Sequence, residues 1–297
     1  MASIQANGIT LEYEEQGEGR PLLLVMGLSG QLIDWPQGFV DMLADQGFRV
    51  IRFDNRDSGL STLFEGVPPT LGEMAKLVLL RRKMRSEYVV SDMAGDAVGL
   101  LDVLGIARAH VVGVSMGGMI AQAMAIAHPE RVLSLTSIMS TTGNRKVGRP
   151  KAKVIFRAAR RGRATGEDDV IGNVIQQFTD ISGPGFNPDE FRVSAEASLA
   201  RSWRPDGTAR QMAAILASDD RTDGLRGLTV PTLVIHGMVD PLVQPSGGIA
   251  TAKAVPNARL LMFPDMGHDL PKARWHEMAV AIASNAARVQ AISAPQV

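Results

Sequence analysis

The 297-residue sequence contains no cysteine. This absence excludes disulfide bonds, thiolate metal ligands and a cysteine nucleophile in one step. An excess of charge is missing as well, because 31 basic residues balance 31 acidic ones. A chain without net charge gives no indication of a nucleic-acid partner or a membrane-surface partner.

Long hydrophobic runs are also missing. The first eight residues have neither the basic nor the apolar segment of a secretory signal, and the apolar run at 22–26 is too short to span a bilayer. We therefore expect no membrane insertion and a cytoplasmic protein, the compartment in which disulfide-free chains are usual. The sequence has no phosphate-binding glycine loop ending in Lys-Ser/Thr and no dinucleotide fingerprint, so we predict no cofactor and no metal.

Short apolar runs with almost no polar interruption predict strands that are covered on both faces. Asn7-Gly8 precedes them and predicts a type I′ hairpin. Stretches with helical spacing, at 92–104 and 118–127, separate some of the runs, which indicates an α/β protein with a mostly parallel sheet flanked by helices. The predicted strands lie at 21–26, 49–53, 110–114, 133–139, 232–236 and 259–263.

The strand signals stop between residues 141 and 228, where only amphipathic helices are indicated. We predict a core domain made of residues 1–140 and 229–297, with a helical cap of residues 141–228 inserted after the sixth strand. A final helix is predicted to place one apolar face on the core, formed by Trp275, Met278, Ala279, Ile282 and Ala286.

Residues 113–117 read Gly-Val-Ser-Met-Gly, directly after a buried run and directly before a helical stretch. A sharp strand-to-helix turn forces the central serine into a strained conformation with its Oγ at the tip. The flanking positions then crowd each other and must be glycine, as Gly113 and Gly117 are. We predict that Ser115 is a nucleophile; the alternative is a glycine-rich turn that only joins strand to helix.

A serine hydroxyl needs a neighbouring base to take its proton. Where this turn carries a nucleophile, the chain order is nucleophile, acid, base. His268 follows the run at 259–263, at the C-terminal strand end where sites form on open α/β sheets. We predict that His268 is the base, and His236 is the main alternative, although it precedes the acid.

The base needs a buried carboxylate that fixes its tautomer. Asp240 follows the run at 232–236 and is stiffened by Pro241, so we predict that Asp240 is the acid. Asp265 and Asp269 flank His268 on the same short loop, and this proximity keeps them from reaching behind its ring. The predicted catalytic triad is Ser115, Asp240 and His268.

Several motifs in chain order resemble the α/β-hydrolase superfamily over nearly the whole sequence. In particular they resemble the branch containing aclacinomycin methylesterase and related small serine esterases. The motifs are Leu-Leu-Leu-Val-Met-Gly-Leu at 22–28, Asp-Trp-Pro at 34–36, Arg-Phe-Asp-Asn-Arg-Asp-Ser-Gly at 52–59, Gly-Val-Ser-Met-Gly-Gly at 113–118, His-Gly-Met-Val-Asp at 236–240 and Phe-Pro-Asp-Met-Gly-His at 263–268.

The resemblance implies an oxyanion hole formed by the backbone N–H groups of Leu28 and Met116. Residues 26–27 are Met-Gly, where many members carry His-Gly. The loop at 54–59 departs from the usual pattern too, since Asp57 and Ser58 stand where small residues are common. We expect its residue Arg56 to fix the loop, with a substrate-carboxylate clamp as the alternative.

By the same resemblance, the expected activity is hydrolysis of carboxylic esters of small to medium apolar molecules through an acyl-enzyme on Ser115. The same triad also serves cofactor-free perhydrolases (haloperoxidases), lactonases and C–C bond hydrolases, and similar folds act as ligand-binding receptors. We expect the cap to decide the substrate range and to contribute nothing to the chemistry. Four side chains either line an apolar pocket or pack in the core: Trp35, Met119, Leu242 and Val243.

Overall fold

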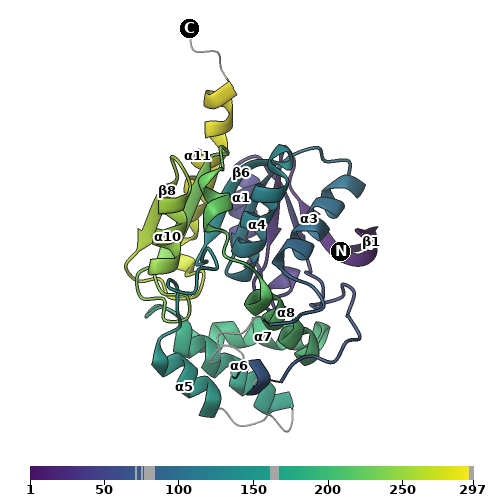
Figure 1. Cartoon of the computed structure of the whole chain (residues 1–297), viewed down its shortest axis with the longest axis vertical. Coiled ribbons are helices and arrows are strands. Elements are labelled where there is room, and N and C mark those ends of the chain that lie inside the picture. The colour runs from purple at the N-terminus through teal and green to yellow at the C-terminus, as the bar shows by residue number, and fades with distance from the viewer. Residues whose placement is uncertain (71, 75, 77–83, 161–166, 294–297) are drawn as a thin grey trace.

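A twisted eight-stranded sheet forms the centre of the computed structural model, which describes residues 1–293 except 71, 75, 77–83 and 161–166 (Figure 1). The strand order is β1-β2-β4-β3-β5-β6-β7-β8, and all pairs from β4 to β8 are parallel. The strands are β1 (Ala2–Ala6), β2 (Ile9–Gln16), β3 (Arg20–Val25), β4 (Phe48–Phe53), β5 (Ala109–Val114), β6 (Val132–Ile138), β7 (Thr232–Gly237) and β8 (Arg259–Phe263).

The antiparallel edge begins with the predicted hairpin. Asn7 and Gly8 both have positive φ, at 51° and 78°, and they connect the closing pair Ala6 and Ile9. Positive φ at both central positions defines the type I′ turn, whose twist matches that of the strands. The hairpin prediction is therefore confirmed.

Helices cover both faces of the sheet in the way that the alternation of side chains requires. Leu22 and Leu24 of β3 belong to the cluster with α1 (Gln37–Asp45) and α11 (Trp275–Ser293). Leu23 and Val25, pointing the other way, pack with α3 (Val90–Val103) and α4 (Met116–Ala127). Each fully buried leucine contributes about 2 kcal/mol. The predicted α/β-hydrolase fold is confirmed in its mostly parallel sheet and flanking helices.

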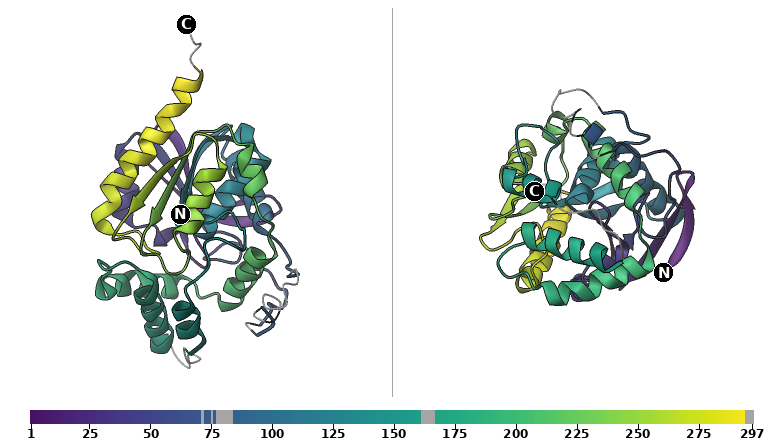
Figure 2. Two further views of the ribbon diagram at one scale, coloured as in Figure 1. Left: turned by 60° about the vertical axis from the view of Figure 1, so that its left-hand side comes forward. Right: turned by 90° about the horizontal axis from the view of Figure 1, so that it is seen from below.

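Between β6 and β7, the described residues form helices and no strand. Figure 1 shows α5, α6, α7 and α8 gathered below the sheet, and Figure 2 shows from below how they extend across that end of the molecule. Their bounds are α5 (Ala152–Arg160), α6 (Glu167–Ile181), α7 (Pro188–Arg201), α8 (Pro205–Ala217) and α9 (Thr222–Arg226). The division into a core domain and a cap at 141–228 stays a prediction.

The remaining helical elements are short or lie at the edges of the sheet. Among the helices that the structure describes, none combines the length and the apolar character needed to cross a bilayer. On α11, Met278, Ala279, Ile282 and Ala286 are buried, as the predicted apolar face requires. The others are α10 (Ser246–Ala254), η1 (Leu32–Asp34), η2 (Pro129–Arg131) and η3 (Lys272–Arg274).

Candidate active site

Ser115 stands alone between β5, which ends at Val114, and α4, which begins at Met116. Its backbone has φ 54° and ψ −118°, a region that non-glycine residues rarely adopt. A Cβ on Gly113 would lie 2.1 Å from the carbonyl oxygen of Gly117, and a Cβ on Gly117 would lie 2.0 Å from that of Val25. The turn is therefore possible only with glycine at both positions.

The side chains of Ser115, His268 and Asp240 form one continuous chain of hydrogen bonds. His268 Nε2 lies 2.9 Å from Ser115 Oγ, and His268 Nδ1 lies 2.7 Å from Asp240 Oδ2. An ionised carboxylate can only accept, so Nδ1 carries the proton and Nε2 offers its lone pair to the serine hydroxyl. All three residues follow the C-terminal ends of parallel strands, β5, β7 and β8.

Asp240 is fully buried, and its second oxygen is also occupied. Oδ1 accepts the backbone N–H groups of Leu242 at 2.8 Å and Val243 at 2.9 Å. These donors fix the orientation of the carboxylate and stabilise its charge in a site without water contact. Asp269 has a different task, since its Oδ1 accepts the backbone N–H groups of Gly183 and Gly267, both at 3.0 Å.

His236, the alternative base, lies on the other side of Asp240. Its Nε2 is 2.7 Å from the carbonyl oxygen of Val243 and 3.6 Å from Asp240 Oδ2. The imidazole is fully buried, and this burial lowers its pKa, which favours the neutral ring. A neutral Nε2–H that donates to a carbonyl cannot act as a base toward Ser115.

The segment after β3 passes directly beside the serine. A Cβ on Gly27 would lie 3.2 Å from Ser115 Cβ, so only glycine leaves this approach unstrained. Leu28 follows on this loop, and Met116 opens α4 on the other side of the nucleophile. An oxyanion hole requires two N–H donors beside the nucleophile, and the assignment of this role to Leu28 and Met116 stays a prediction.

Among the four residues that were predicted to line a pocket or to pack in the core, Trp35 packs in the core. Its side chain has no exposed surface and stacks on Phe39 with 6.3 Å between ring centroids, inside the core cluster that contains α1 and α11. Met119 and Val243 each keep 8% exposure, and Leu242 is partly exposed, so for these three the pocket stays a prediction.

The loop after β4 carries three ion pairs with little exposure, made by Asp54 with Arg201, Arg56 with Asp96 and Asp57 with Arg210. Both oxygens of Asp96 accept from Arg56 at 2.6 Å, so Arg56 is not available as a substrate clamp. Asp57 accepts two bonds from Arg210 of α8 at 2.9 and 2.8 Å and one from the Tyr88 hydroxyl at 2.6 Å. An acidic residue at position 57, where small residues are common, indicates a basic partner. The sequence does not show that this partner is Arg210.

The chain is similar to known hydrolases over most of its length. The model of the family described as alpha/beta hydrolase fold matches residues 20–271. Sequence identity is 28% to rhodomycin D methylesterase DauP of Streptomyces sp. (strain C5), covering 95% of this chain and 96% of that protein. It is 31% to 2-hydroxymuconate semialdehyde hydrolase of Pseudomonas putida, covering 89% of this chain and 86% of that protein.

A solved hydrolase structure has the same fold as this chain. The malate-bound thermophilic esterase from Thermogutta terrifontis superimposes with a TM-score of 0.73 at 25% identity, covering 97% of this chain and 99% of that chain.

Proposed function

Because this chain belongs to the α/β-hydrolase fold family, we propose that it hydrolyses carboxylic esters of small to medium apolar molecules through an acyl-enzyme on Ser115. The observation that carries the proposal is the chain of bonds Ser115–His268–Asp240, with distances of 2.9 and 2.7 Å. It couples a serine hydroxyl to a base and a buried carboxylate, which is the arrangement that activates a serine for acyl transfer.

In the first half-reaction, Ser115 Oγ attacks the ester carbonyl while His268 Nε2 takes the hydroxyl proton. The carbonyl oxygen becomes an oxyanion, and the N–H groups of Leu28 and Met116 are the donors assigned to it in this proposal. His268 then gives its proton to the departing alkoxide, and the C–O bond of the ester breaks. Asp240 stabilises the imidazolium during both proton transfers.

In the second half-reaction, water replaces the alcohol. His268 takes a proton from the water as it attacks the acyl carbonyl, and returns this proton to Ser115 Oγ when the acid leaves. The cycle balances without any redox partner, because one water is consumed for each ester cleaved. Losing one oxyanion donor should cost about 3 kcal/mol of transition-state stabilisation.

Cleavage of a carbon–carbon bond is the second candidate activity. It is favoured by the 31% identity to 2-hydroxymuconate semialdehyde hydrolase. Esters are the stronger expectation because a methylesterase and an esterase resemble this chain over nearly its full length. Parallel assays with p-nitrophenyl esters, methyl esters and 2-hydroxymuconate semialdehyde separate the two activities by their kcat/KM values.

Active-site labelling tests the proposed nucleophile. A fluorophosphonate should add to Ser115 alone, and Ser115→Ala should lose the label and lower ester hydrolysis by about a million-fold without unfolding. The matched control is Ser134→Ala on β6, which removes a buried hydroxyl that is hydrogen-bonded to His110. This variant should keep the label. Labelling of any other serine would show that the assignment is wrong.

A further inference from the structure

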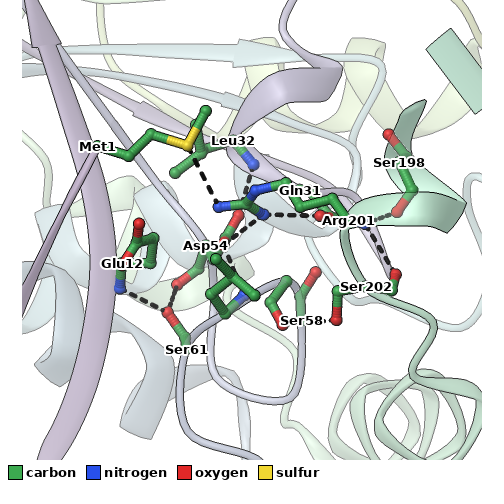
Figure 3. A network of polar contacts seen from close by, with 12 residues as sticks. Met1, Glu12, Gln31, Leu32, Asp54, Ser58, Ser61, Ser198, Arg201 and Ser202 are labelled. Atoms are coloured by element: carbon green, nitrogen blue, oxygen red, sulfur yellow. Dashed lines mark hydrogen bonds and ion pairs between the residues drawn. The ribbon is translucent and has the colours of Figure 1, made fainter.

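The cap helices hold the loop on which Leu28 lies. This loop, residues 27–34, is fixed from the core side by Asp54, whose Oδ1 accepts the backbone N–H of Leu32 at 2.7 Å. From the cap side, Gln31 donates from Nε2 to the carbonyl oxygens of Ser198 at 2.6 Å and Ser202 at 3.0 Å. Figure 3 shows these bonds converging from the two sides.

Arg201, the last residue of α7, joins the two sets of contacts. Its Nη1 donates to Gln31 Oε1 at 2.6 Å and lies 2.8 Å from Asp54 Oδ2 (Figure 3). Asp54 is fully buried, and burial raises the pKa of its carboxyl group, while the contact with Arg201 opposes that shift. The loop and the cap are therefore tied through a fully buried carboxylate and an arginine whose side chain is only 11% exposed.

A second cap residue reaches closer to the nucleophile. Gln211 of α8 has no exposed surface, and its Oε1 accepts the backbone N–H of Ser29 at 2.8 Å. Its Nε2 donates to the carbonyl oxygen of Arg56 at 2.7 Å. These opposite demands, one acceptor and one donor, allow only one orientation of the amide. Arg56 is itself held by Asp96, so the amide bridges Ser29 to a rigid point.

Ser29 needs such support. It directly follows Leu28, its φ is 60°, and its residue surface is exposed. A left-handed conformation costs a serine about 1 kcal/mol, and an exposed loop can relax toward water when its bonds are lost. The peptide unit that Gln211 holds begins at Leu28 Cα, and the preceding peptide unit, which carries the Leu28 N–H, ends at the same atom. A shift of the loop at Ser29 that moves Leu28 Cα would therefore displace the Leu28 N–H.

We propose that Gln211 is a positioning residue that fixes the Leu28 N–H toward the oxyanion site. The inference rests on the proposed function, because it assigns Leu28 to that hole. An oxyanion hole stabilises the transition state only when its donors stand in place before the reaction, so a displaced N–H lowers kcat and leaves substrate binding unchanged. The expectation that the cap contributes nothing to the chemistry does not take the contact between Gln211 and Ser29 into account.

The cap also supports the base. Its helix α6 ends at Ile181, whose carbonyl oxygen accepts the backbone N–H of His268 at 2.8 Å. A Cβ on Gly183 would lie 2.1 Å from the carbonyl oxygen of Asp265, so the cap backbone touches the histidine loop directly. Residues from α6 and α8 thus reach opposite sides of the same site.

The test is Gln211→Met, which keeps the length and volume of the side chain and removes both hydrogen bonds. We expect kcat for p-nitrophenyl acetate to fall by about ten- to a hundred-fold, less than the loss of a whole donor, with KM within about twofold of wild type. Affinity for a trifluoromethyl ketone, which forms the oxyanion on Ser115, should fall by the same factor as kcat. Gln211→Glu retains the acceptor for Ser29 and should lie between wild type and Gln211→Met.

The matched control is Ser218→Ala at the other end of α8. It removes a bond of similar length, 3.0 Å from the backbone N–H of Val90, without touching residues 27–30. We expect a similar loss of thermal stability with wild-type kcat. Wild-type kcat in Gln211→Met, or equal losses of kcat in both variants, would overturn the inference. An inactive wild-type protein that no fluorophosphonate labels would instead overturn the proposed function.

Discussion

Asp240→Asn replaces a fully buried carboxylate by an amide of the same shape, so packing is preserved. The structure dictates how that amide must orient. Two backbone donors, from Leu242 at 2.8 Å and Val243 at 2.9 Å, point at the Oδ1 position, which therefore has to be taken by the amide oxygen. The amide NH2 group then faces His268 Nδ1, at the position from which Oδ2 accepts in the wild type.

This orientation puts the base in the wrong tautomer. Two donors cannot face each other, so His268 Nδ1 must accept and the ring proton moves to Nε2. Nε2 then donates toward Ser115 Oγ and can no longer take its proton. We expect kcat to fall by about four orders of magnitude, which corresponds to about 5 kcal/mol in the activation barrier.

Steady-state hydrolysis of p-nitrophenyl acetate measures this loss, and thermal unfolding verifies that the variant folds. Asp269→Asn is the matched control, because its Oδ1 accepts two backbone N–H groups at 3.0 Å and an amide oxygen can do the same. It should stay close to wild type. If Asp240→Asn keeps more than about a tenth of the wild-type kcat, the tautomer argument fails. Equal losses in both variants would indicate collapse of the loop.

Two further predictions concern stability. Burial lowers the pKa of His110 from 6.5 to about 4. Between these two pH values the native state binds fewer protons than the unfolded chain. The free energy of unfolding is therefore largest above pH 6.5 and declines toward pH 4. The His110 share of this loss approaches about 3 kcal/mol in urea unfolding. His110→Asn should remove that share and leave the part that comes from the buried His236, whose pKa burial also lowers; an unchanged dependence would refute the cause. Arg210→Met removes the positive charge beside the buried Asp57 and leaves it the neutral donors Tyr88 Oη–H and Phe64 N–H. It should cost about 4 kcal/mol in urea unfolding, whereas adding Asp57→Asn should restore part of it. Additive losses would contradict the pairing.

The inner strands were predictable because burial on both faces leaves short, uninterrupted apolar runs, and their predicted ends deviate by one residue. The run at 259–263 coincides with β8, an edge strand in which only Phe263 is buried, so there an apolar run marked the strand without burial on both faces. The start of α4 shows why ends are less certain: the prediction began at 118, and the helix begins at Met116. Glycine is a poor helix former, yet Gly117 lies in the first turn because only glycine fits against Val25.

The proximity of Ser115, Asp240 and His268 was predictable because each residue follows the C-terminal end of a parallel strand, while their catalytic role stays a proposal. For Trp35 the sequence left pocket lining and core packing open. The direction of its ring, toward Phe39, depends on packing that no local pattern encodes. The contacts of Gln211 were missed for a similar reason, since they reach main-chain atoms, and any residue supplies an N–H or a C=O.

Contacts to main-chain atoms do not depend on which side chains the cap carries. The bonds from the cap to the catalytic loops include the carbonyl oxygens of Ile181, Ser198 and Ser202. These acceptors persist when side chains on the same helices are exchanged. If the cap decides the substrate range, as we propose, then replacement of its apolar side chains should change that range while His268 and Gln31 stay anchored. On the same proposal, side chains such as Gln211, which bond to the loops themselves, link the identity of a cap residue to the rate of the chemical step.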